Sequence, residues 1–266
     1  MKRQMPVLFM GGVIVCAIMV FGAAPAKAVQ TVLSGVPPYY LHNGCSPTSG
    51  GMLVGYYDQL GGYGDLIAET TDPYDMIATP LDGFTNSIAD FMNTDAAGGT
   101  VDPMIATGIE DYIEWDDPTT PINESYSATV WNVYTDDPEI GVPGDFTFGD
   151  YVAEIDTGRP MLLSWGTPTG RGHTTIGIGY DDNDTQSLLD DRVATYTTWS
   201  GSAEPDWWYF APDMSESNQS GWNLDLGTFV RIEPRTVIPA PGSILLASIG
   251  AGLVGWFRRI RRKTLR

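Results

Sequence analysis

Residues 42–67 read HNGCSPTSGGMLVGYYDQLGGYGDLI, and the fold prediction starts from this segment. From residue 52 onward, apolar side chains recur at the three- and four-residue spacing of one helical face. Ser46 suits the N-cap of a helix, Pro47 suits its first turn, and the glycines at 61–62 suit its end. We therefore predict a helix that starts directly after Cys45 and ends near residue 60.

The rest of the chain predicts helices first and strands second. Shorter helical patterns follow over residues 84–92, 105–113 and 152–155, and Gly158 suits the end of the last one. Runs typical of strands then follow at residues 160–165, 174–180, 193–199, 207–210 and 228–232. This order predicts an α+β domain, with a helical first half, an antiparallel sheet in the second half, and a functional site in the cleft between the halves.

The composition excludes several classes of function. The chain has 266 residues, of which 33 are acidic and 14 basic, with two His and two Cys. A net charge of −19 argues against a nucleic-acid partner, because binding phosphates requires clustered Lys and Arg. There is no P-loop pattern and no CxxC pair for zinc, and two cysteines do not make a disulfide scaffold. The acidity fits a solvated surface as well as it fits a surface for calcium or a basic partner.

Residues 1–28 have the pattern of a secretory signal peptide. A basic start precedes an apolar run, and residues 26–28 read AKA, a small-residue cleavage pattern. We expect export through the Sec translocon and cleavage by signal peptidase after Ala28; a retained anchor helix is the alternative. Because Cys16 lies in the apolar run, the mature protein is expected to hold Cys45 as its single cysteine.

Residues 237–266 combine three parts. Pro239-Ala240-Pro241 precedes an apolar stretch over residues 244–257, and a basic cluster opens at Arg258. This order resembles the PEP-CTERM sorting signal of Gram-negative bacteria, in which the first motif is Pro-Glu-Pro. The resemblance implies transient membrane insertion of the C-terminal helix, processing by an exosortase, and release to the envelope, surface or extracellular matrix. A simple C-terminal anchor is the alternative. One domain, residues 29–236, is expected between the two targeting segments.

Cys45 and His173 are the candidate pair for nucleophilic chemistry. Cys45 stands directly before the predicted helix, whose free N–H groups stabilise a thiolate. A cysteine at a helix start and a histidine on a later strand is the arrangement that a Cys–His dyad requires. A small buried cysteine and a structural histidine are the alternative interpretation. Two further clustered ligands are lacking, so the pair does not predict a metal site.

The segment around Cys45 is similar to the nucleophile segment of exported papain-like cysteine peptidases of the bacteriocin-processing, peptidase C39-like type. That segment typically reads Asn-Gly-Cys-Gly-Pro-Thr-Ala and then Gly-Tyr-Trp-Asp. The matching residues here are Asn43, Gly44, Cys45, Pro47, Thr48, Gly55, Tyr56 and Asp58. A second segment, residues 158–182, also matches, since His173 is followed after five residues by Gly-Tyr-Asp. The two segments occur in the order expected for this group.

The resemblance implies a papain-like fold in which Cys45 is the nucleophile and His173 the general base and then the acid, with an acyl-enzyme intermediate. Two positions depart from the group. Thr197 stands where an Asp or Asn orients the imidazole, so the candidate orienters are Thr197 and the nearby acids Asp181 and Asp182, and the alternative is that no orienter is present. The Gln that completes the oxyanion hole is missing, and Asn43 is the candidate donor beside the backbone N–H of Cys45.

No cofactor is predicted. The acidic segment Asp181–Asp184 follows the histidine strand, but its spacing is not that of an EF-hand. A solvated turn is therefore favoured over a calcium site.

The sequence predicts an exported cysteine peptidase acting on a peptide or protein of the envelope or exterior. The alternative is a peptidase-like binding module with weak or no catalysis, which the departures at Thr197 and at the missing Gln allow. A third interpretation is an envelope structural protein that shares only the sorting segment, in which Cys45→Ala would have no effect.

Overall fold

The computed structural model describes residues 29–60, 63–64, 66–67, 73–78, 86–115, 126–135, 145–167, 169–182, 190–210 and 221–234. The expected signal peptide and the expected sorting signal both lie outside the described residues. Within those ranges, no helix has the length and apolar character needed to cross a membrane.

The described helices and strands follow the predicted order in most places. In chain order they are β1 (Val29–Val32), α1 (Cys45–Gln59), the 3-10 helix η1 (Asp75–Ile77), α2 (Ile88–Phe91), α3 (Asp102–Glu114), β2 (Tyr126–Tyr134), α4 (Phe148–Asp156), β3 (Met161–Gly166), β4 (Gly172–Asp182), β5 (Arg192–Tyr196), β6 (Asp206–Tyr209) and β7 (Asn223–Pro234).

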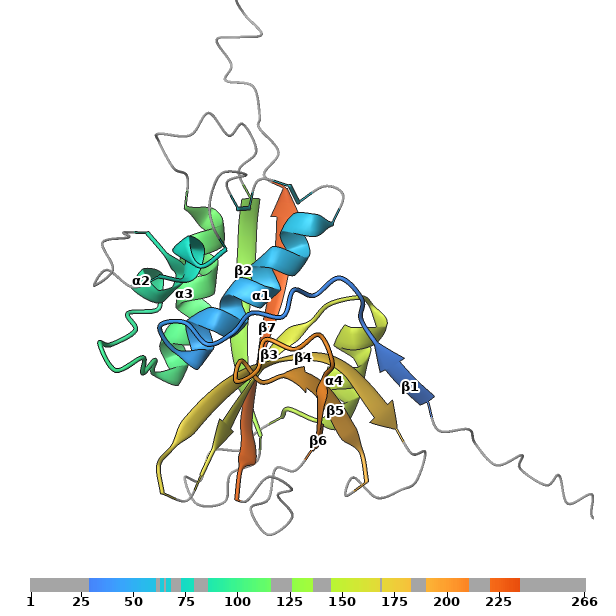
Figure 1. The fold of residues 1–266 in the computed structure, drawn as a ribbon. Helices are drawn as coiled ribbons and strands as arrows, with labels where there is room; N and C mark the ends of the chain where they lie inside the picture. Colours follow the sequence, from blue (N-terminus) through green and yellow to red (C-terminus); the bar gives the residue numbers. More distant parts are fainter. Residues whose placement is uncertain are drawn as a thin grey trace, which may run out of the picture.

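The described strands form one antiparallel sheet in the order β2-β7-β3-β4-β5-β6, so the predicted α+β class with an antiparallel sheet is confirmed. β3 pairs with residues 172–177 of β4, and β1 pairs with residues 179–182 of the same strand. β1 therefore pairs with the part of β4 that lies beyond the end of β3. Figure 1 shows how strongly the sheet curves.

The prediction that strands are confined to the second half was wrong. β1 and β2 belong to the first half, and β2 pairs with β7 along its whole length. β2 alternates in the way a half-buried strand does, with Tyr126, Ala128 and Val130 buried and Thr129 and Trp131 exposed. β2 comes from one half of the chain and its partner β7 from the other, so each half contributes strands to the sheet.

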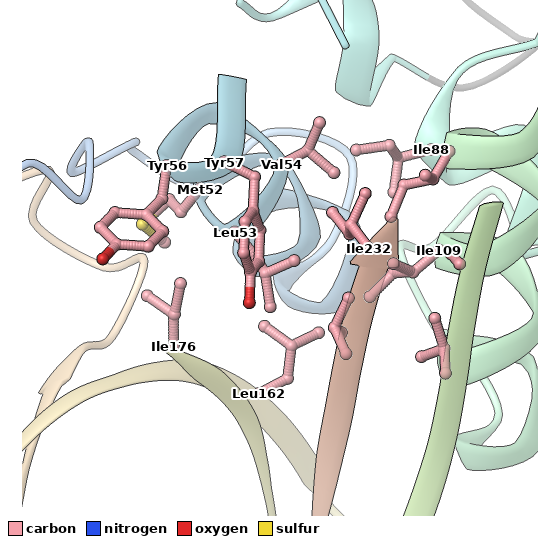
Figure 2. Packing of buried hydrophobic residues seen from close by; sticks show 14 of the residues in the cluster. Met52, Leu53, Val54, Tyr56, Tyr57, Ile88, Ile109, Leu162, Ile176 and Ile232 are labelled. Carbon is pink, nitrogen blue, oxygen red and sulfur yellow. The ribbon is translucent and has the colours of Figure 1, made fainter. Parts of the chain in front are cut away.

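The sheet is covered on both faces (Figure 1). On one face α1 packs against β3 and β4, and α3 packs against β2 and β7. Figure 2 shows Leu53 and Tyr57 of α1 directed toward Leu162 of β3. On the other face α4 buries Tyr151 and Ile155. Each fully buried side chain of this size contributes about 1.5–3 kcal/mol through removal from water, so this packing holds α1 on the sheet.

α1 begins one residue earlier than predicted, at Cys45, and its N-cap is Gly44 instead of Ser46. The Ser46 side chain does not cap the helix, because its hydroxyl is hydrogen-bonded to Thr174 of β4 at 2.7 Å. Every residue of the helix from 46 to 57 is buried. The helix that opens with Cys45 is thus held on the sheet from its first turn.

Candidate active site

Cys45 is placed by a close approach of two backbones. Gly44 has a φ of +112°, and a Cβ added there would lie 2.5 Å from the carbonyl oxygen of Gly98. Only glycine combines that conformation with that contact. The loop that contains Gly98 therefore lies directly against the start of α1, and Cys45 follows as a partly exposed residue.

Hydroxyl groups fasten the first turns of α1 to β4. The Ser46 Oγ lies 2.7 Å from the Thr174 Oγ1, and the Ser49 Oγ donates to the Thr174 carbonyl at 3.0 Å. Thr174 is the residue after His173 in β4. Because these contacts are buried, they fix the position of the helix start relative to the histidine strand.

Cys45 and His173 line the same cavity, whose volume is about 350 Å³. The cavity lies between the start of α1, residues 98–100, and residues 166–167 and 170–172 at the facing ends of β3 and β4. The Asp and Arg side chains that line it are those of Asp102, Arg171 and Asp225. Burial raises the pKa of Asp102. The predicted nucleophile and the predicted base therefore line the same cavity.

His173 is held in one tautomer. Its ring is buried, and Nε2 lies 2.8 Å from the carbonyl oxygen of Thr197. A carbonyl oxygen only accepts, so Nε2 donates the hydrogen and Nδ1 keeps its lone pair. The Trp199 ring stacks on the imidazole with the ring centroids 4.2 Å apart and the planes 15° apart.

Burial also keeps the imidazole neutral. Removal from water lowers the pKa of His173 to about 4, although the hydrogen bond to Thr197 raises it in part. Near neutral pH the ring is therefore uncharged, and Nδ1 is able to accept a proton.

Thr197 contacts His173 through its backbone and not through its side chain. The Thr197 hydroxyl donates instead to the Asp206 Oδ2 at 3.0 Å. The strand predicted over 193–199 stops at Tyr196, because Thr198 has a φ of +65° and leaves the extended conformation. This turn directs the Thr197 carbonyl to the imidazole. The expected orienting position is thus filled by a peptide group.

The acids at 181–182 are not orienters, which corrects one of the predicted alternatives. Asp181 and Asp182 lie at the opposite end of β4 from His173, eight and nine residues away, or about 26–30 Å along a strand. Asp181 pairs with Arg192 of β5. The remainder of the predicted acidic loop lies outside the described residues. Among the residues that are described, no group of three or more His, Cys, Asp or Glu is placed to hold a metal ion.

Asn43 precedes the helix start but is not among the residues that line the cavity. Its φ of +51° belongs to the turn that leads into Gly44. Helix geometry leaves the backbone N–H groups of Cys45 and Ser46 without an acceptor inside α1, and both residues line the cavity. These N–H groups are donors suited to an oxyanion.

Sequence reasoning missed three parts of the site: the wall at residues 98–100, the strained Thr198, and Asp206. The glycine pair at 98–99 predicts a turn but not its partner. The Thr-Thr-Trp run carries no signal that a carbonyl will face the histidine. Asp206 is one of many acids in an acidic chain, so composition does not single it out.

In a comparison with protein families, residues 29–208 match the model of the Peptidase_C39 like family. The matched range contains Cys45, His173, Thr197 and Asp206. A search of curated proteins finds no match for this chain.

Proposed function

The chain belongs to the Peptidase_C39 like family, and we propose that it is an active cysteine peptidase that uses Cys45 and His173 to hydrolyse peptide bonds. One observation carries the proposal: Cys45 and His173 line one cavity, and the hydrogen bond from Nε2 leaves Nδ1 of His173 free to accept a proton. The proposal includes a papain-like arrangement, with the site between the start of α1 and the sheet.

The reaction begins with attack on the substrate carbonyl. Nδ1 of His173 takes the proton from the Cys45 thiol as the sulfur forms a bond to the carbonyl carbon. The carbonyl oxygen gains the electron pair and is stabilised by the N–H groups of Cys45 and Ser46 at the helix start. The two donors lie at the N-terminus of α1, where the helix dipole is positive and favours this negative charge.

The tetrahedral intermediate then collapses. His173 returns its proton to the leaving amine, the C–N bond breaks, and a thioester to Cys45 remains. Water attacks the thioester while His173 takes a proton from it. The C–S bond then breaks and His173 returns the proton to the sulfur. Release of the acid product leaves the thiol and the neutral imidazole.

The neutral partner at Thr197 changes the electrostatics of this scheme. A carboxylate beside the imidazole stabilises the imidazolium formed during attack, whereas a backbone carbonyl supplies only a dipole. The resting imidazole is therefore neutral, and it takes up the thiol proton during attack. We infer that the chain works as a base-assisted peptidase across neutral pH.

The rate of Cys45 alkylation by iodoacetamide, measured against pH, tests this proposal. We expect the wild-type rate at pH 6–7 to exceed that of a free thiol, whose pKa is about 8.5, and to fall in His173→Ala. Cys45→Ala reports the background from Cys16. A wild-type rate that follows an ordinary thiol and ignores His173→Ala contradicts the peptidase assignment.

A second candidate function is peptide binding without turnover. The observation that favours it is the replacement of a charged orienter by the Thr197 carbonyl. Binding of peptides that protect Cys45 from alkylation, without any hydrolysis on long incubation, would support this function over the first. Steady hydrolysis that is lost in Cys45→Ala would eliminate it.

We further propose that the domain over 29–236 is exported. The sequence patterns over 1–28 and 237–266 support delivery by the Sec translocon, removal of the leader by signal peptidase, and sorting by an exosortase to the envelope or exterior. N-terminal sequencing of protein secreted by a Gram-negative host tests the first step. A mature chain that starts at Val29 is expected, and a chain that keeps residues 1–28 contradicts it.

A further inference from the structure

The catalytic histidine is oriented by a peptide group, so its geometry depends on whatever holds that peptide group. The Thr197 carbonyl accepts from Nε2 of His173 at 2.8 Å. Its direction is set by the backbone torsions of Thr197 and Thr198. A small rotation there would turn the carbonyl away and release the imidazole.

That backbone is strained. Thr198 is β-branched and has a φ of +65°, a conformation that such residues rarely adopt. Its hydroxyl is buried and has no hydrogen-bond partner among the described residues. A conformation of this cost persists only where neighbouring contacts over-determine it.

Two hydrogen bonds restrain this segment. On one side, the backbone N–H of Leu41 donates to the Thr198 carbonyl at 2.7 Å. On the other side, the Thr197 hydroxyl donates to the Asp206 Oδ2 at 3.0 Å. Asp206 opens β6, which pairs with β5, so its backbone is held by the sheet. The bond to a carboxylate is of the stronger, charge-assisted kind.

We propose that Asp206 is a positioning residue for His173, acting through Thr197. The inference rests on the proposed function. Asp206 holds the Thr197 side chain, and this keeps the Thr197 carbonyl directed at Nε2 and Nδ1 available to Cys45. In similar peptidases an acid orients the imidazole by direct contact. Here Asp206 takes that place indirectly, through its hydrogen bond to Thr197.

Nitrogen-15 labelling of histidine provides a readout that does not require activity. The full chain has only His42 and His173, so the spectrum contains two imidazoles, and His42→Gln assigns them. In the wild type we expect His173 as a single neutral tautomer with hydrogen on Nε2. In Asp206→Ala and Thr197→Val, which keep the Thr197 carbonyl but remove its restraint, we expect a mixture of tautomers.

The alkylation rate of Cys45 gives the second readout. Asp206→Ala and Thr197→Val should each lower the His173-dependent rate at pH 7 about 10-fold or more, since small misplacements of a catalytic group have effects of this size. Thr197→Ser keeps the hydroxyl and should restore both the tautomer and the rate. Asp206→Asn keeps an acceptor and should retain the tautomer. Glu233→Gln, an exposed acid on β7, is the matched control.

The outcomes separate this inference from the proposed function. If Asp206→Ala and Thr197→Val keep the single tautomer and the wild-type rate, Asp206 does not position His173, and the peptidase assignment is untouched. If the wild-type alkylation rate does not depend on His173, the assignment fails, and the tautomer still decides the role of Asp206. If Asp206→Ala has a lowered melting temperature, the comparison of Thr197→Val with Thr197→Ser tests the role of Asp206 instead.

Discussion

At the scale of single residues, the site depends on groups whose roles differ from what their side chains suggest. Thr197 contributes its carbonyl to His173 and its hydroxyl to Asp206. Gly44 has no side chain, and this lets the Gly98 backbone approach the start of α1. The burial of His173 sets its charge. Each role follows from local geometry and makes a separate prediction.

The buried imidazole makes stability depend on pH. The pKa of His173 is lowered from 6.5 to about 4, so between these values the unfolded chain binds a proton that the folded chain does not. Stability contributed by the neutral ring is present above pH 6.5 and is lost as the pH falls to about 4. Urea denaturation should show a loss that is smaller in His173→Gln, by up to about 3 kcal/mol. An identical pH dependence in both proteins would contradict the assigned shift.

Gly44→Ala tests the backbone contact behind Cys45. The added Cβ meets the Gly98 carbonyl oxygen at 2.5 Å, and the positive φ strains any side chain. We expect a loss of roughly 1–3 kcal/mol in unfolding free energy and slower alkylation of Cys45. Gly64→Ala is the control, because no atom lies within 4 Å of its added Cβ. Equal stability of the two variants would argue against the close approach.

At the scale of elements, glycines in helices allow close packing. α1 has Gly50, Gly51 and Gly55 within its buried turns, and a Cβ at Gly51 would lie 2.3 Å from Ile77. In α3, a Cβ at Gly108 would lie 2.6 Å from the backbone nitrogen of Met92. These glycines lower the helix propensity, but they let α1, α2 and α3 approach one another closely.

Two substitutions of the same kind should therefore have opposite effects. Gly108→Ala should destabilise the protein, because the new methyl group meets the Met92 backbone, which does not give way easily. Gly149→Ala in α4 should stabilise it by up to about 1 kcal/mol, since the nearest atom is a Thr147 hydroxyl at 3.6 Å. Thermal melting of both variants checks the contrast. A stabilising Gly108→Ala would show that α2 and α3 do not pack as described.

At the scale of the whole molecule, an ion cluster ties α4 to β7. The buried carboxylate of Glu154 accepts from Arg159 at 2.8 Å and from Arg231 of β7 at 2.6 Å. Burial raises the pKa of Glu154, but the hydrogen bonds and charges of Arg159 and Arg231 outweigh it, and the net pKa is lowered. This cluster helps hold the helix on one face of the sheet to a strand that spans the fold.

Glu154→Leu should destabilise the protein by about 3 kcal/mol near pH 7, because it leaves two arginines without their buried partner. The value lies at the low end for buried pairs, since the arginine side chains are 30% and 34% exposed. Because the folded pKa is lowered, the contribution of Glu154 is present at neutral pH and is lost on acidification. Urea denaturation at pH 7 and pH 3 measures both effects. Glu204→Gln, an exposed acid, should change stability by less than about 0.5 kcal/mol.

Much of the fold was predictable from the sequence, because the relevant signals are local. The periodicity after residue 46 predicts α1, and the apolar runs predict β3 to β7, since each pattern lies within one element. The segments around Cys45 and His173 predict the family that the comparison found. Cys45 directly before a predicted helix and His173 at the start of a predicted strand were the candidate pair, and both line the cavity.

The remaining features were decided by tertiary structure, because they depend on contacts between distant segments. β2 is a strand because β7 pairs with it, although about a hundred residues separate partners such as Val130 and Val230. The role of Thr197 depends on a backbone torsion at Thr198, which no residue type at that position dictates. Residue types and their spacing predicted the longer helices, most strands and the two candidate side chains, Cys45 and His173, that line the cavity. Only the folded chain determined which peptide group holds the histidine, since carbonyl direction is set by torsions and long-range contacts.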